Sequence, residues 1–311
     1  MTVQDAEQRR EQRVGTLAGL AAYSLWGLFP LVFHQLRDVA AMEILLHRIT
    51  WSFVVVIVLL EIRRDRSWLG ILRRASPDRR RLVLAALLIS INWLVYVWAV
   101  TEGQVLQAAL GYYINPLFTV ALGVVVLGEH LRRLQVIALG FGLASVAVLT
   151  VAYGQVPWIS LVLAFSFGGY GYLKKAVKVS APTSLAVETA VLVPVATVAL
   201  AVLALRGEGA MGTGSTGRDA LLLSLGAVTA TPLLLFAASA RRIPLTLLGL
   251  LQYLTPTVQF ICAVAILGEE LPTDRLAGFA LVWIALMVLA VDALDDNRRR
   301  RDARLEPVEP T

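Results

Sequence analysis

Three ionisable residues lie close together inside one long apolar segment of the sequence. Glu43, His47 and Arg48 fall within residues 41–62, and a fourth such residue, Glu188, falls within another apolar segment. On a helix Glu43 and His47 share a face because they are four residues apart, whereas Arg48 points about 100° away from His47. Groups of this kind can exchange protons, form ion pairs or bind a polar solute.

A second set of candidate residues combines aromatic rings with side-chain amides. Asn92, Trp93 and Tyr96 share one helical face. Two further groups flank prolines, which can kink a helix and free a carbonyl for a ligand or water. They are Tyr112, Tyr113 and Asn115 beside Pro116, and Gln252, Tyr253 and Gln259 beside Pro256. Aromatic walls with a few polar groups suit flat, partly apolar organic solutes.

The composition indicates that these residues are held inside a membrane. The chain is 58% hydrophobic and 16% charged, with a mean hydropathy of +0.72. Its apolar runs are long enough to cross a bilayer core of about 30 Å, and their continuity predicts helices rather than barrel strands. The predicted fold is therefore an all-α integral membrane protein. Ten spans are predicted, at residues 14–34, 41–62, 82–101, 105–127, 132–152, 157–174, 182–206, 219–240, 245–268 and 275–293.

The membrane setting makes the ionisable residues functional candidates, because each costs at least ~2.5–3.5 kcal/mol at the bilayer centre. We expect Glu188 to be a lone buried acid, which is the usual proton-coupling group, and the alternative is a structural pair with a polar neighbour. A purely structural role also stays open for Glu43 and Arg48. An acid in the first turn of a helix suits the helix dipole, and the arginine could pair with Glu43 or a carbonyl. The aromatic residues could equally form interfacial belts, and the amides could join neighbouring helices.

Positive charge is distributed unevenly between the two sides of the predicted membrane. Of the 28 Lys and Arg residues, 23 fall in the tails and loops of one side, four fall on the other, and Arg48 lies inside a span. Positive charge is retained in the cytoplasm, so both termini are predicted to be cytoplasmic and the number of spans to be even. The net charge of +6 is therefore attributed to orientation and not to nucleic-acid binding.

No cofactor or metal is expected. The single cysteine, Cys262, excludes a disulfide within the chain and a thiolate metal site. The sequence has no phosphate-binding glycine loop, no HExxH and no paired set of metal ligands.

The chain contains a weak copy of itself. Pro116 is followed twelve residues later by Gly-Glu at 128–129, and Pro256 is followed by the same pair at 268–269, with an offset of 140 residues. Two halves of five spans follow, and because five is odd the second half must be inverted. The predicted parts are a cytoplasmic N-tail at 1–13, a first five-helix repeat at 14–152, a second, inverted repeat at 153–293 and a cytoplasmic C-tail at 294–311.

Several other residues are expected to be structural. Glu129 and Glu269 follow helix ends and are predicted to be loop or capping residues. The tail after Val291 is expected to be disordered. Five glycines are expected to allow close packing of helices. They are Gly19, Gly27, Gly168, Gly169 and Gly171.

Six segments resemble the RarD-type proteins, which are EamA-domain permeases of the drug/metabolite transporter superfamily. They are SLWGLFP (24–30), EILLHR (43–48), NWLVYVWAV (92–100), LGYYINPL (110–117), LGEHL (127–131) and LLQYLTPTVQF (250–260). The resemblance covers nearly all of residues 14–293, and the very basic loop at 63–81 is its main departure. It implies a ten-helix permease for small organic molecules in a bacterial inner membrane.

Three classes of function stay open at this point. The leading interpretation is a secondary transporter for small metabolites or amphipathic drugs, in which proton coupling through Glu188 or Glu43 and facilitated diffusion are equally compatible with the sequence. A scaffold or sensor would leave the inverted repeat unexplained, and an intramembrane enzyme would need catalytic residues beyond His47. Substrate, direction, coupling ion and oligomeric state do not follow from the sequence.

Overall fold

The structure is a computed structural model that describes residues 3–74, 76–127, 131–175, 177, 179–240, 242–243, 247–248 and 251–305. All regular elements in these ranges are helical. They are α1 (Val3–Gly27), α2 (Phe29–His34), α3 (Ala41–Ile62), α4 (Ser67–Arg73), α5 (Pro77–Thr101), α6 (Val105–Leu127), α7 (Arg133–Tyr153), α8 (Trp158–Lys175), α9 (Ala181–Arg206), α10 (Thr216–Ala240), α12 (Leu254–Ile261), the π-helical turn η1 (Cys262–Ile266) and α13 (Thr273–Leu305).

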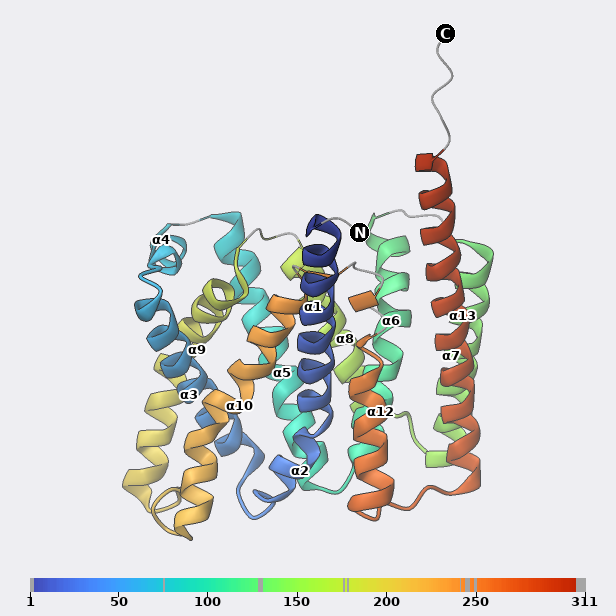
Figure 1. Cartoon of the computed structure of the whole chain (residues 1–311). Coiled ribbons are helices and arrows are strands. Elements are labelled where there is room, and N and C mark those ends of the chain that lie inside the picture. Colours follow the sequence, from blue (N-terminus) through green and yellow to red (C-terminus); the bar gives the residue numbers. More distant parts are fainter. Residues whose placement is uncertain are drawn as a thin grey trace.

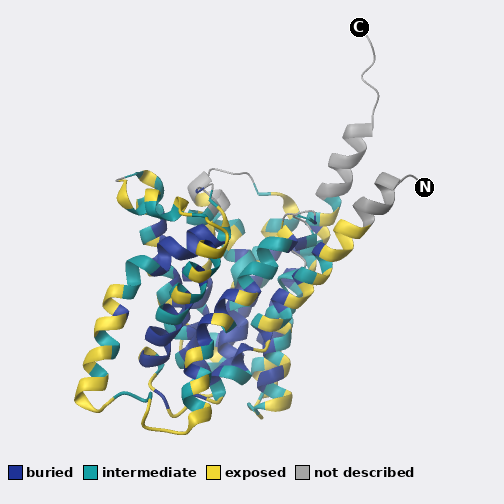
Figure 2. Cartoon of the chain, turned by 60° about the vertical axis from the view of Figure 1, so that its left-hand side comes forward, coloured by how far each residue is buried: buried dark blue, intermediate teal, exposed yellow. Residues whose placement is uncertain are grey.

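The long helices run side by side as one bundle (Figure 1). Helix α1 begins and α13 ends at the same end of this bundle, which also carries α4, while α2 lies at the opposite end. Buried residues gather in the middle of the bundle and exposed residues on its outside (Figure 2). Many exposed side chains are large and apolar, such as Leu205 at 88% and Val151 at 83% exposure. An outer surface of this kind is suited to lipid.

Within the described ranges, eight helical segments are long and apolar enough to cross a membrane. Two predicted spans fall outside this set. Helix α8, at predicted span 157–174, ends in two lysines and carries glycines and tyrosines, and it packs between α5 and α6. Predicted span 245–268 contains a shorter apolar helix at Leu254–Ile266.

Prolines explain where two predicted spans are divided. Residues 14–34 were expected to form one helix, but α1 ends at Gly27 and α2 begins at Phe29. Pro30 has no backbone N–H to donate to the preceding turn, so the helix breaks just before it. In the second case, a turn at Gln252 and Tyr253 precedes α12, and Pro256 lies in the first turn of that helix. Helix α6 continues through Pro116.

Glycines let three pairs of helices approach closely. A Cβ at Gly27 would lie 2.5 Å from Val258, and a Cβ at Gly19 would lie 2.6 Å from the Ser239 hydroxyl. A Cβ at Gly168 would overlap the ring of Phe118. The expectation was wrong for Gly171, which has no neighbour within 4 Å of such a Cβ. Small residues thus fix the contacts of α1 with α12, of α1 with α10, and of α8 with α6.

The C-terminal tail departs from its prediction. Residues after Val291 were expected to be disordered, but α13 continues to Leu305. This stretch lacks proline and glycine, and five Arg, two Ala and two Leu, which are good helix formers, outnumber its four Asp. Helix propensity therefore extends the last span beyond its apolar part.

Candidate functional site

Arg48 is at the centre of the candidate site. It lies about two turns into α3, and 4% of its surface is exposed. Its guanidinium carbon lies 4.1 Å from the ring centroid of Trp93, and the rings of Phe33 and Phe29 lie 5.4 and 5.5 Å away. Its Nε donates a hydrogen bond of 3.0 Å to the Thr229 hydroxyl on α10. Arg48 does not pair with Glu43, which was one sequence-based alternative.

These contacts offset only part of the cost of burying Arg48. A desolvated cation–π contact contributes about 2 kcal/mol, whereas removing an unpaired charge from water costs several kcal/mol. A guanidinium has five N–H donors, and Nη1 of Arg48 is buried without a hydrogen-bond partner. The site therefore holds unused hydrogen-bonding capacity and uncompensated positive charge.

Tyr96 joins the two halves of the chain next to Arg48. Its ring centroid lies 6.0 Å from that of Phe33 and 5.7 Å from that of Tyr112. Gln259 on α12 donates to the Tyr96 hydroxyl at 3.1 Å, and its Oε1 is buried without a partner. Aromatic rings and a free amide oxygen thus continue the wall that begins at Arg48.

Asn92 holds three helices together on the other side of Tyr112. Its Oδ1 accepts a 3.1 Å hydrogen bond from the Tyr112 hydroxyl on α6. Its Nδ2 donates to the Leu163 carbonyl and the Ser166 hydroxyl on α8, both at 3.1 Å. Asn92 thus positions the Tyr112 ring, and both N–H groups of its amide have partners within the protein.

Glu43 and His47 lie on the same face of α3, as their spacing predicts. Glu43 Oε1 accepts a 2.6 Å hydrogen bond from the backbone N–H of Ala210, in the loop between α9 and α10, and lies 3.8 Å from His47 Nε2. His47 Nδ1 accepts from the Trp51 indole at 3.3 Å. Glu43 therefore fastens a loop to the start of α3.

Glu188 is not the lone acid that the sequence suggested. Lys174 on α8 forms an ion pair with its Oε1 at 2.7 Å, and the Ser184 hydroxyl donates to the same oxygen at 2.7 Å. The Tyr170 hydroxyl donates to Oε2 at 3.3 Å, and Lys174 also contacts Ser184. Thr183, the residue just before Ser184, hydrogen-bonds toward α4, so this cluster lies at the end of the bundle that carries α4.

The remaining candidates lie apart from Arg48 or make structural contacts. Tyr113 donates to Thr257 at 3.0 Å and so ties α6 to α12. Asn115 lies next to Gly168, and its Oδ1 is buried without a partner. Gln252 and Tyr253 form the half-buried turn that precedes α12.

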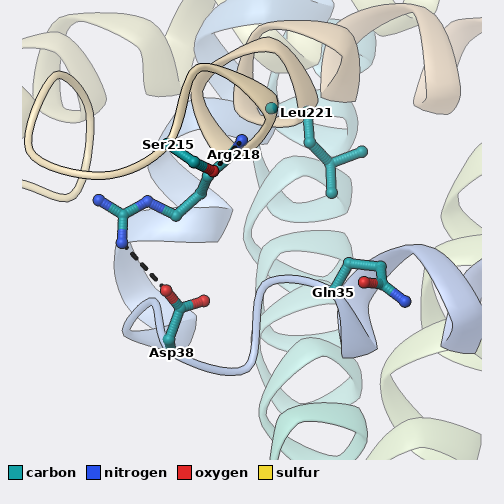
Figure 3. A pocket seen from close by; sticks show the side chains of 6 residues that line it. Gln35, Asp38, Ser215, Arg218 and Leu221 are labelled. Carbon is teal, nitrogen blue, oxygen red and sulfur yellow. Dashed lines mark hydrogen bonds and ion pairs between the residues drawn. The ribbon is translucent and has the colours of Figure 1, made fainter.

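A surface pocket opens at the end of the bundle opposite α4. It has a volume of ≈ 590 Å³ and is lined by Gln35, Asp38, Ser215, Gly217, Arg218 and Leu221. Figure 3 shows Arg218 of α10 pointing across to Asp38 in the loop between α2 and α3, with 3.0 Å between Nη1 and Oδ2. This guanidinium holds the pKa of the Asp38 carboxyl below its ordinary value. The ion pair therefore joins the two segments that form the pocket wall.

Sequence reasoning missed several members of these sites. Phe29, Phe33 and Thr229 complete the surroundings of Arg48, and Lys174 completes those of Glu188. A phenylalanine or threonine in an apolar span carries no distinguishing signal. Lys174 carried one, because a lysine at a helix end can reach an acid on the next helix, but it was counted only as a loop charge.

Comparison with known proteins agrees with a helical membrane protein. Residues 13–151 match the model of the EamA-like transporter family. Protein RarD of Streptomyces exfoliatus is 47% identical over 301 residues, which cover 97% of this chain and 95% of that protein. Protein RarD of Escherichia coli K12 is 41% identical over 295 residues, covering 95% and 99%. A solved crystal structure with 20% identity has a TM-score of 0.59 over 90% of this chain and 98% of that chain, which shows a shared fold.

The apolar outer surface, the long helices and the buried polar centre define a multi-pass membrane protein of the transporter class. Its relatives over nearly the full length are bacterial proteins. The chain belongs to the EamA-like transporter family and, within it, to the RarD-type proteins.

Proposed function

We propose that the chain is a secondary transporter that moves small organic metabolites or amphipathic drugs across a bacterial inner membrane by alternating access. It crosses the membrane ten times, as two inverted five-helix repeats at residues 14–152 and 153–293. The observation that carries this proposal is the buried site around Arg48. Helices of the first half supply Arg48, Trp93 and Tyr96, and helices of the second half supply Thr229 and Gln259. A solute at this point would contact both halves at once.

The pattern of helix contacts supports the inverted repeat. If α1, α3, α5, α6 and α7 correspond in order to α8, α9, α10, α12 and α13, the most extensive helix contacts have counterparts when the halves are exchanged. Helix α8 packs on α5 and α6, and α1 packs on α10 and α12. The pairs α3 with α9, α6 with α12, and α7 with α13 each map onto themselves. Such symmetry gives two near-equivalent states, one open to each side.

Charge supports an orientation with both termini in the cytoplasm. The start of α1, α4 and the end of α13 lie at one end of the bundle (Figure 1). The basic loop at 63–81, the start of α1 and the end of α13 belong to that end, whereas Arg37, which follows α2, and Arg218, which pairs with Asp38, belong to the other. The positive-inside rule therefore assigns the α4 end to the cytoplasm.

Polar contacts at both ends of the bundle could serve as gates around the central site. On the outer side, Glu43 holds the Ala210 loop and Asp38 pairs with Arg218. On the inner side, Glu188 pairs with Lys174. Glu43 and Glu188 are the counterparts that the repeat predicts in the second and seventh spans. An alternating mechanism would break one set of contacts while the other stays closed.

Proton coupling through Glu188 is part of the proposal. Protonation would remove the negative charge that holds Lys174, and would so weaken the link between α8 and α9. Glu188 itself is buried, with 1% of its surface exposed, and an ionisable residue buried within a membrane span is a functional candidate.

The test is a flux assay that assumes no substrate. Purified protein in liposomes is loaded with small-molecule extract from bacterial cells, and solutes that leave are identified by mass spectrometry, with and without a pH gradient. We expect a small set of organic solutes to cross faster than in protein-free liposomes and than with Trp93→Ala. Equal release of every solute from protein-containing and empty liposomes would refute transport.

A further inference from the structure

Arg48 carries a positive charge that its surroundings leave uncompensated. In the described part of the chain, its contacts are three aromatic rings and the Thr229 hydroxyl, and Nη1 has no partner. None of the ion pairs among the described residues includes it.

Other buried charges in the same protein are treated differently. Glu188 has Lys174 at 2.7 Å, and Asp292 has Arg132 at 2.7 Å. Glu43 accepts a backbone hydrogen bond and lies 3.8 Å from His47. Among the buried charged residues that the structure describes, Arg48 therefore differs in having no carboxylate beside it, and helices of both halves of the chain meet around it.

We infer that the guanidinium of Arg48 binds the anionic group of the transported solute, which is an organic carboxylate on a flat, apolar body. This inference rests on the proposed function and specifies its substrate class. A guanidinium matches a carboxylate in shape and charge, and such charge-assisted hydrogen bonds are stronger than neutral ones. The carboxylate would supply the acceptor that Nη1 lacks and the charge that the site lacks.

The rest of the site fits the body of such a solute. The rings of Trp93, Phe33 and Tyr96 offer apolar faces on which a flat molecule can stack. Gln259 Oε1, which has no partner, could accept from a hydroxyl or amide N–H on the solute. These side chains are closed around one another here, with Phe33 fully buried and 2% of Tyr96 exposed, so binding accompanies opening of one gate.

Paired probes test the inference on the unaltered protein. Benzoate is compared with benzamide, and indole-3-acetate with indole-3-acetamide, so that each pair differs in charge and hardly in shape. Dissociation constants are measured by calorimetry near neutral pH with the full chain in lipid nanodiscs. We expect each acid to bind at least about tenfold more tightly than its amide, as expected for a hydrogen bond to a charged group. Equal binding within both pairs, or no binding by either acid, would overturn the inference.

Variants then assign the preference to Arg48. Arg48→Gln should remove the difference between acid and amide, and Arg48→Lys, which keeps the charge without the planar fork, should retain part of it. The matched control is Arg275→Gln, because Arg275 also stacks on an aromatic ring, Tyr153, at 4.4 Å, but lies at the start of α13. An unchanged acid preference in Arg48→Lys and Arg48→Gln would reject the assignment. If Arg48→Gln does not fold, the wild-type pairs and Arg48→Lys decide.

The outcome is separable from that of the flux assay. Transport of neutral solutes without any preference for acids would reject the anion site and leave the transporter intact. Acid binding that depends on Arg48, together with no flux of any solute, would reject transport and leave the anion site.

Discussion

The ammonium group of Lys174 lies 2.7 Å from the Glu188 carboxylate and joins α8 to α9. The two side chains differ in exposure, since 26% of Lys174 but 2% of the Glu188 side chain is accessible. If the pair separates, the lysine can reach water, whereas the carboxylate stays buried with Ser184 and Tyr170. In the proposed transport cycle, this ion pair would therefore hold α8 against α9 only while Glu188 is charged.

This asymmetry predicts the behaviour of Glu188→Gln. A glutamine can still accept from the Ser184 hydroxyl through its amide oxygen and donate to the Tyr170 hydroxyl through its amide nitrogen, so the protein should fold and express normally. The charge that holds Lys174 is lost, and we expect flux to fall by about tenfold or more and to become insensitive to a pH gradient, as for other intramembrane proton-coupling acids. The measurement is flux in liposomes, with protein amount checked by quantitative blotting.

Glu61→Gln is the matched control for this experiment. Glu61 also pairs with a basic residue, Arg66, at 3.0 Å, but the two side chains are 48% and 70% exposed. An exposed pair contributes about 0–1 kcal/mol, so its loss should leave flux and stability nearly unchanged. Wild-type flux in Glu188→Gln would exclude the acid from coupling.

The ion pair between Asp38 and Arg218 predicts a pH-dependent contribution to stability at the end of the bundle opposite α4. Arg218 lowers the pKa of Asp38 below its ordinary value of 3.8, so the pair stabilises the protein above that value and is lost as the pH falls through the lower pKa of the folded state. Asp38→Asn should therefore lower the melting temperature, Tm, near neutral pH, with a difference that shrinks in strongly acidic buffer. Scanning fluorimetry over pH measures this difference.

Asp38→Asn should also make the surface pocket between Asp38 and Arg218 more accessible. With Ser215→Cys introduced in a Cys262→Ala background, Asp38→Asn should raise labelling by an impermeant maleimide up to about fivefold, the range of an exposed pair. Asp274→Asn, at an exposed position of the same bundle end, provides the control. A labelling rate that does not respond to Asp38→Asn would show that this pair does not restrict the pocket.

Most helices could be predicted from the sequence because apolar length is a local property. The predicted segments 41–62 and 105–127 coincide with α3 and α6. The helix breaks before Pro30 and Pro256 were harder to predict from the sequence, because a proline near a helix start is equally compatible with a continuous span. The helical extension of α13 was missed because charge was given more weight than helix propensity.

The candidate site was only partly predictable, for a different reason. Glu43 and Arg48 were identified as ionisable residues within an apolar span. Spacing along α5 placed Trp93 and Tyr96 together, since residues three or four apart share a face. Which helices would meet there depends on packing over more than a hundred residues, so the contact of Arg48 with Thr229 carried no local signal. The same limit applied to Lys174 and Glu188.

Glu269 caps a helix that is distant from it in the sequence. It was predicted to be a capping residue, and its carboxylate accepts hydrogen bonds from the backbone N–H groups of Val105 at 2.5 Å and Leu106 at 2.9 Å. It therefore caps α6 and not its own helix. Glu269→Ala should destabilise the protein by about 0.5–2 kcal/mol, the usual effect of losing a cap, and lower Tm accordingly. Glu270→Ala, at the exposed neighbouring position, should leave Tm unchanged, and equal Tm losses for the two would disprove the cap.

Replacement of Gly226 should disturb the packing of α10 against α3. It lies buried in α10, and a Cβ there would overlap the backbone carbonyl group of Trp51 on α3, which no rotamer change can relieve. Gly226→Ala should therefore force α3 and α10 apart, cost about 1–3 kcal/mol and lower Tm by several degrees. Gly140→Ala is the matched control in α7, because nothing lies within 4 Å of its Cβ, and it should keep or slightly raise Tm.

Because α3 carries Arg48 and α10 carries Thr229, Gly226→Ala should also reduce flux. A variant with normal Tm and flux would mean that this helix pair is not as closely packed as the structure has it.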